Sequence, residues 1–261
     1  MTIVHRTVAN LRRQDWMAIA VEFVLLVCGV FLGIQVANWN EDREQDKKSA
    51  VFTERLKEDL RIEAWNYEVQ VGYNQQVLAN AQRTVDALAG RVPLSDEALL
   101  VAAYRATQFN GNARRRATYD ELASTGEIGL IRDKALRTLA MDVYTQPQID
   151  QIDRHGQESD YRKAFRMALP YEVQQALQDK CGDHVLAIDD YAGIAQELDY
   201  PCTTGLAPDV IASSAATLRN DPRFVPLLEL RITDIATDLA NLTTYFKYMS
   251  DPLKRLAKEK P

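Results

Sequence analysis

Two of the three cysteines have a spacing that could support chemistry. Cys181 and Cys202 flank residues 182–201, the part of the chain with the weakest helical pattern. In an oxidising compartment we expect them to form a disulfide, which adds about 3 kcal/mol to the free energy of unfolding in the chain-entropy model. Two independent buried thiols are the alternative. The absence of a Cys-x-x-Cys motif disfavours redox catalysis.

Three consecutive arginines, residues 114–116, precede a segment rich in hydrogen-bonding side chains. Cations at the start of a helix oppose the helix dipole, so their charge needs compensation. Asp120 and Glu121, an anionic ligand or lipid headgroups could supply it. A ligand or anion site, if the chain has one, is expected here; the alternative is a tightly capped helix–loop–helix. The candidate residues are Arg114, Arg115, Arg116, Thr118, Tyr119 and Glu121.

An acidic cluster with one imidazole lies between the two cysteines: Asp183, His184, Asp189 and Asp190. Its spacing matches neither a calcium loop nor a zinc pattern, so we expect a solvated loop and no metal site. The other histidines are His5 and His155, and no Ser-His-Asp or Cys-His order stands out. The sequence therefore predicts no catalytic residues, no cofactor and no enzymatic activity.

An apolar segment near the N-terminus determines where the rest of the chain lies relative to a membrane. Glu22 is the only charged residue between Met17 and Asn40, and Trp16 and Trp39 bracket the segment. About 20 apolar residues suffice to cross a bilayer as a helix, and interfacial tryptophans are typical of such spans. The abrupt charged flanks disfavour a buried soluble helix. A cleaved signal peptide is disfavoured because its apolar region is too long and the residues before Ala37 do not suit cleavage.

One face of this segment combines small residues with its single carboxylate. Glu22, Gly29 and Gly33 fall on one helical stripe, and Ala37 continues the small-xxx-small pattern. This face predicts association with a second copy or with another membrane protein. Common membrane glycines beside a carboxylate that snorkels to the interface are the alternative. An ion-coupled role for Glu22, which Glu22→Gln would abolish, is a third interpretation.

The charges beside the segment predict its orientation. Arg12 and Arg13 lie directly before it, and the preceding tail is short. We therefore expect residues 1–15 to be a short cytoplasmic tail, residues 16–39 the transmembrane helix and residues 40–261 a periplasmic helical domain. The expected location is a bacterial inner membrane.

Periodicity and capping residues predict helices throughout the remaining chain. Expected helices cover residues 41–90, 95–108, 148–168, 170–180 and a long apolar terminal stretch around 227–249. Ser95 and Asp133 suit N-caps, Thr118-x-x-Glu121 suits a capping box, and Pro208 and Pro222 suit first helical positions. Together with few glycines (11) and prolines (9), this predicts an all-α fold, an N-terminal transmembrane helix followed by an elongated bundle.

Two segments resemble a known family. Residues 29–41 (GVFLGIQVANWNE) and 118–133 (TYDELASTGEIGLIRD) resemble a family of bacterial membrane-anchored proteins of unknown function. The resemblance implies an inner-membrane anchor and a helical domain. It transfers no functional residue, because no activity is assigned to that family.

These features predict a membrane-anchored periplasmic interaction or sensory module without catalytic activity that associates with itself. An ion-coupled accessory subunit that uses Glu22 and a small-ligand-binding periplasmic domain are the alternatives. The expected partners are the lipid bilayer and a second copy or another membrane protein. The net charge of −6 disfavours a nucleic-acid partner.

Overall fold

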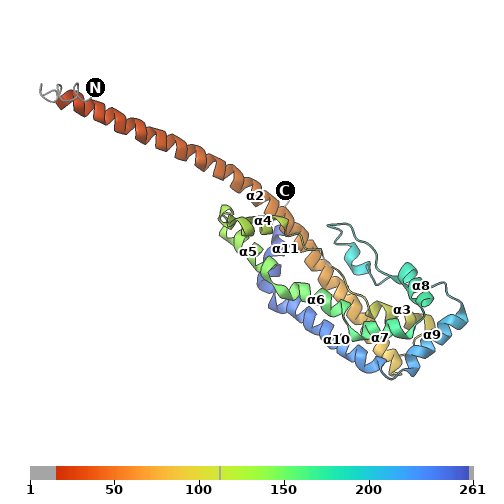
Figure 1. The fold of residues 1–261 in the computed structure, drawn as a ribbon. Coiled ribbons are helices and arrows are strands. Elements are labelled where there is room, and N and C mark those ends of the chain that lie inside the picture. The colour runs from red at the N-terminus through yellow and green to blue at the C-terminus, as the bar shows by residue number, and fades with distance from the viewer. Residues whose placement is uncertain (1–15, 112, 259–261) are drawn as a thin grey trace. The chain divides into compact units, whose positions relative to one another are not determined.

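A computed structural model describes residues 16–111 and 113–258 of the chain, without the side chains of Ala18 and Gln148. The described residues form helices and connecting loops, with no β-strand among them (Figure 1). The predicted all-α class is confirmed. The expected cytoplasmic tail, residues 1–15, lies outside the described residues. The helices are α2 (Trp16–Leu88), α3 (Asp96–Ala106), α4 (Ala117–Thr125), α5 (Lys134–Thr145), α6 (Pro147–Gln157), α7 (Asp160–Ala168), α8 (Tyr171–Cys181), α9 (Pro208–Asn220), α10 (Phe224–Ala240) and α11 (Lys247–Lys258).

The chain divides into two compact units, residues 1–53 and 54–261. In the first unit, α2 carries large apolar side chains that are exposed to the surroundings, among them Phe23, Leu26 and Phe31. By length and composition, α2 is the one helix in the described part of the chain that is long and apolar enough to cross a membrane. Exposed apolar side chains on such a helix are what a lipid-facing segment requires.

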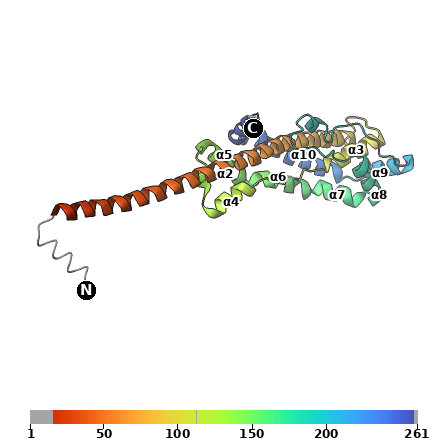
Figure 2. The ribbon, with the colours of Figure 1, turned by 90° about the horizontal axis from the view of Figure 1, so that it is seen from above.

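The second unit buries its core around the C-terminal part of α2. Leu56, Leu60, Tyr73 and Val77 are fully buried there, which confirms the helical periodicity expected for this stretch. Helix α3 packs against α7, α8 and α9, and α10 packs against α7. Seen from above, α10 follows α2 along this unit (Figure 2), and the Tyr67 hydroxyl donates a hydrogen bond to the Leu242 carbonyl. The unit is therefore a helical bundle that encloses the end of α2.

Several predicted helix ends are confirmed. The Ser95 hydroxyl accepts the Ala98 N–H at 3.2 Å, and the Asp133 carboxylate accepts the N–H groups of Ala135 and Leu136. Gly126 adopts φ of 74° after α4, a left-handed conformation that glycine tolerates without strain. Local sequence signals thus fix where α3, α4 and α5 begin or end.

The capping box predicted at Thr118 and Glu121 is wrong. Helix α4 begins at Ala117, so Thr118 already lies inside its first turn. The Thr118 N–H instead donates to the Asp59 carboxylate of α2, at 3.2 Å. A residue 59 positions away in the sequence supplies the cap, and local pattern cannot reveal such a partner.

Two predicted continuous helices are interrupted. Residues 148–168 form α6 and α7 with a break at residues 158–159, which turns Tyr161 and Phe165 into the core. The terminal stretch is divided by the π-helical turn η3 (Asn241–Tyr245) between α10 and α11. Pro222 is not a first helical residue, because α10 begins at Phe224 and Asp221 accepts the Arg223 N–H in a preceding turn.

Candidate functional site

The first of the three arginines is buried in an ion-pair network. Arg114 Nε donates to the Glu63 carboxylate of α2 at 2.7 Å, and only 9% of the Arg114 side chain and 4% of the Glu63 side chain are exposed. Arg114 also contacts the Asp150 carboxylate at 3.1 Å and donates to the Val143 carbonyl at 2.7 Å. Its charge is therefore compensated within the protein.

The neighbouring candidates have mixed environments. The Arg115 N–H donates to Glu63 at 2.5 Å while its side chain is exposed, and Arg116 pairs with Asp120. Glu121 pairs with Arg55 of α2 at 2.8 Å. The Tyr119 ring lies 5.0 Å from the Tyr144 ring, centroid to centroid. Most of this motif joins α4 to α2 and α5, and Arg115 alone of the three arginines keeps an exposed guanidinium without an ion pair in residues 16–111 and 113–258.

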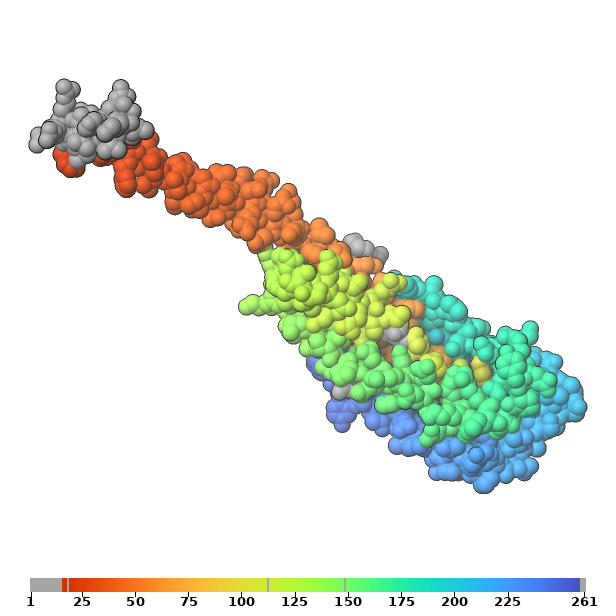
Figure 3. Space-filling model, viewed as in Figure 1, coloured from red at the N-terminus to blue at the C-terminus, as the bar shows by residue number. Residues whose placement is uncertain are grey.

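The structure joins Cys181 and Cys202 by a disulfide. The bond links the end of α8 to the segment before α9, and we call residues 182–207 between these helices the disulfide loop. It contains one short 3-10 turn, η2 (Gly193–Gln196). Drawn in cyan in the space-filling view, much of the loop lies at the surface of the second unit (Figure 3).

Side chains from two helices hold the disulfide loop in place. The Gln76 side chain of α2 accepts the N–H groups of Leu198 and Asp199 and donates to the Ile194 carbonyl, at 2.6–2.9 Å. Arg105 of α3 donates to the carbonyls of Cys181 and Tyr200. The loop therefore has a defined path although it is not helical.

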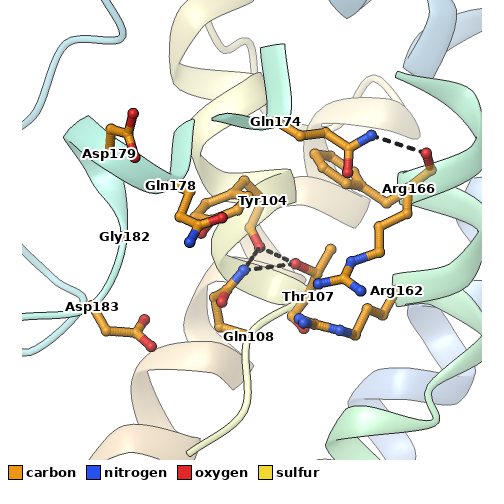
Figure 4. Close-up of a pocket in the computed structure, with 11 residues that line it drawn as sticks. Tyr104, Thr107, Gln108, Arg162, Arg166, Gln174, Gln178, Asp179, Gly182 and Asp183 are labelled. Carbon is orange, nitrogen blue, oxygen red and sulfur yellow. Dashed lines mark hydrogen bonds between the residues drawn. The ribbon is translucent and has the colours of Figure 1, made fainter. Parts of the chain in front are cut away.

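A polar cavity of about 380 Å³ lies between α3, α7, α8 and the start of the disulfide loop (Figure 4). We call it the arginine cavity, because Arg162 and Arg166 of α7 point into it from one side. Asp179 of α8 and Asp183 of the loop lie on the other side. Its remaining lining residues are Tyr104, Thr107, Gln108, Phe165, Gln174, Gln178 and Gly182.

The two arginines bring two positive charges to one side of the cavity. Arg162 donates to the Thr107 carbonyl at 2.8 Å, and its guanidinium lies 4.8 Å from the Phe109 ring centroid. Burial and the neighbouring Arg166 lower the pKa of Arg162. Among the described residues, neither guanidinium forms an ion pair with a carboxylate. An anionic group is the ligand that this arrangement favours.

Asp183 forms the opposite wall of the arginine cavity. Its carboxylate accepts a hydrogen bond from the Tyr73 hydroxyl of α2 at 2.9 Å. Partial loss of hydration raises the pKa of Asp183, against the lowering effects of Tyr73 and Arg162. The wall thus carries a carboxylate that neighbouring groups hold in a fixed position, on a segment expected only to be a solvated loop.

The structure does not gather the remaining sequence candidates into a site. Glu22, Gly29, Gly33 and Ala37 are exposed along α2 in the first unit. In the described part of the chain, no three His, Cys, Asp or Glu side chains are grouped as metal ligands. His155 contacts the Asp238 carboxylate at 3.3 Å, which links α6 to α10. Sequence reasoning missed Arg162 and Arg166, although their i, i+4 spacing already placed them on one helical face.

We predict that Glu63→Gln lowers the free energy of unfolding by about 3 kcal/mol or more, because it leaves the buried Arg114 charge undercompensated. Chemical denaturation of the full chain in detergent micelles, followed by circular dichroism, measures the loss. Arg116→Ala is the matched control: it removes an exposed pair and should cost less than about 1 kcal/mol. Equal losses for the two variants would contradict the assignment.

Comparison with known proteins adds one relationship. Residues 22–151 match the model of a family of unknown function (DUF6090). No curated protein and no solved structure matches the chain. The matched range runs from the apolar part of α2 into α6, so it includes Glu63 and the three arginines and leaves out Arg162, Arg166 and the disulfide loop. The chain is thus similar, over that range, to an uncharacterised family.

Proposed function

We propose that this protein is a membrane-anchored helical domain that binds a small acidic solute in the arginine cavity and catalyses no reaction of its own. The observation that carries the proposal is the juxtaposition of Arg162 and Arg166, whose guanidinium groups share the cavity without a carboxylate partner in the described part of the chain. Two like charges brought together in a concave polar site repel each other, and an anion relieves that repulsion.

The other walls restrict how such a solute would bind. Guanidinium groups match carboxylate and phosphate oxygens in a planar, bidentate geometry. Asp179 and Asp183 repel an anion from the opposite side, so the acidic group of the solute would lie against α7. A solute with a single acidic end fits this distribution better than one with acidic groups at both ends.

Ligand binding tests the proposal directly. We expect the purified full chain in detergent to bind inorganic phosphate, acetate or a sugar phosphate, with a rise in melting temperature that saturates with concentration. Arg166→Ala should weaken this binding at least tenfold. Lys163→Ala is the matched control, because Lys163 is an exposed cation on the same helix that pairs with Asp160. Unchanged binding by Arg166→Ala, or no binding of any probe, would overturn the proposal.

We also propose that α2 crosses the bacterial inner membrane with residues 1–15 in the cytoplasm and the second unit in the periplasm. The apolar, lipid-compatible surface of α2 supports a membrane span. The disulfide supports an oxidising compartment, because such bonds are rare where thiols are kept reduced.

Thiol labelling of intact cells tests this topology. With an impermeant reagent and a Cys28→Ser background, we expect modification of Cys181 and Cys202 only after reduction and without lysis. Labelling that needs lysis and no reductant would place the second unit in the cytoplasm with free thiols. That result would exclude the periplasmic location.

Self-association through the first unit is the remaining part of the proposal. A Cβ atom added to Gly29 or Gly33 would meet nothing within 4 Å beyond the chain neighbours and the backbone of its own helix. This face of α2 is therefore open to a second helix. We expect cross-linking in membranes to capture a dimer or a larger oligomer, and Gly33→Leu to reduce it severalfold. Val24→Leu, on the opposite face of the same helix, is the control. Equal cross-linking of both variants would exclude this face.

A further inference from the structure

A second cavity is also lined in part by the disulfide loop. It has a volume of about 620 Å³ and is formed by α2, residues 110–111 and 113–115, and the loop. We call it the Glu197 cavity; the lining residues that matter here are Trp65, Arg115, Asp183, Leu186 and Glu197. Asp183 borders both cavities, but Arg162 and Arg166 line only the first.

Two residues that line this cavity each carry one buried polar atom without a hydrogen-bond partner. Trp65 is 9% exposed and Glu197 is 7% exposed. The indole Nε1–H of Trp65 and the Oε2 atom of Glu197 are each without a partner among the described residues. An unsatisfied buried group costs about 1–3 kcal/mol, so two at one cavity call for an explanation. The two groups differ in role, since the indole donates and the carboxylate accepts.

The position of Glu197 is fixed by its neighbours. Its carbonyl accepts the His184 N–H at 3.0 Å, and the next two residues are held by Gln76 of α2. Burial, with a contribution from the nearby Asp183 carboxylate, raises the pKa of Glu197 to about 7. A carboxylate held in this way gains most from a cationic donor that enters the cavity.

The same cavity is lined by a guanidinium of opposite charge. Arg114 is neutralised by Glu63 and Asp150, whereas the exposed side chain of Arg115 forms no ion pair in the described ranges. The cavity therefore combines two carboxylates, Asp183 and Glu197, with one available guanidinium and one unpartnered indole N–H. Apolar side chains, including Leu186, also line it.

We propose that the Glu197 cavity binds a zwitterionic small molecule of the amino-acid class. The ammonium group of the ligand donates to Glu197 and faces Asp183, while its carboxylate accepts from the Trp65 indole and pairs with Arg115. This assignment satisfies both unpartnered groups and uses both signs of charge. The two cavities share Asp183, but Arg162 and Arg166 line only the arginine cavity.

Isothermal titration calorimetry of the full chain in detergent tests the proposal. The probes are the ω-amino acids from glycine to 6-aminohexanoate, with pentylamine and pentanoate as singly charged comparisons. We expect at least one zwitterion to bind at least tenfold more tightly than either comparison. Titrations are repeated in the Arg166→Ala background, which removes anion binding at the arginine cavity and should leave zwitterion binding unchanged.

Two variants test separately how the ammonium group and the carboxylate group of the ligand are bound. Glu197→Gln should weaken zwitterion binding at least tenfold, and Arg115→Ala should weaken it severalfold while leaving pentylamine unaffected. Arg116→Ala is the matched control, and melting temperatures establish that each variant is folded. The proposal is overturned if no zwitterion binds, if pentylamine binds as tightly as every zwitterion, or if Glu197→Gln has no effect. Loss of zwitterion binding in Arg166→Ala alone would assign the ligand to the first cavity and would also overturn it.

Discussion

Both cavities depend on how the backbone of the disulfide loop finds its hydrogen-bond partners. Residues 182–207 form neither a long helix nor a strand, so their peptide groups cannot satisfy one another in a regular ladder. Gln76 of α2 and Arg105 of α3 supply the missing donors and acceptors. A glutamine amide can donate and accept at once, which suits it to an irregular segment. The walls of both cavities follow from these two side chains.

Burial separates arginines that look equivalent in the sequence. Arg114 lies deep in the bundle, and its charge is tolerated because Glu63 and Asp150 neutralise it. Arg116 is exposed, and its pair with Asp120 is worth little in water. Arg162 and Arg166 bring two like charges to one side of a cavity, and neither forms an ion pair in the described part of the chain. An arginine that is neutralised by a carboxylate within the protein joins helices to one another. An arginine that lines a cavity without such an ion pair is available to a ligand.

The fold was largely predictable from sequence, and the sites were not. Helical periodicity and the caps at Ser95 and Asp133 are local signals, so they identified most elements and several of their ends. The cap on Thr118 comes from Asp59, and the break between α6 and α7 serves core packing. Such effects depend on residues distant in the chain, and one sequence does not reveal them.

The candidate sites show the same division. The pairing of Cys181 with Cys202 was expected, because few partners were possible and both lie around one irregular segment. Folding distinguishes the three consecutive arginines: Arg114 and Arg116 form ion pairs within the protein, whereas the side chain of Arg115 is exposed. The roles of Arg162, Glu197 and Trp65 depend on cavities formed by helices and a loop from separate parts of the chain. Spacing along the sequence cannot give that convergence.

The disulfide closes the segment that carries both Asp183 and Glu197, so the lining of both cavities is linked to the state of two sulfur atoms. While the two cysteines are thiols, hydrogen bonds oppose the conformational freedom of the loop, among them those to Tyr73, Gln76 and Arg105. Oxidation then restricts that freedom permanently. The conformational freedom of the loop that lines both cavities thus depends on the redox state of the two cysteines.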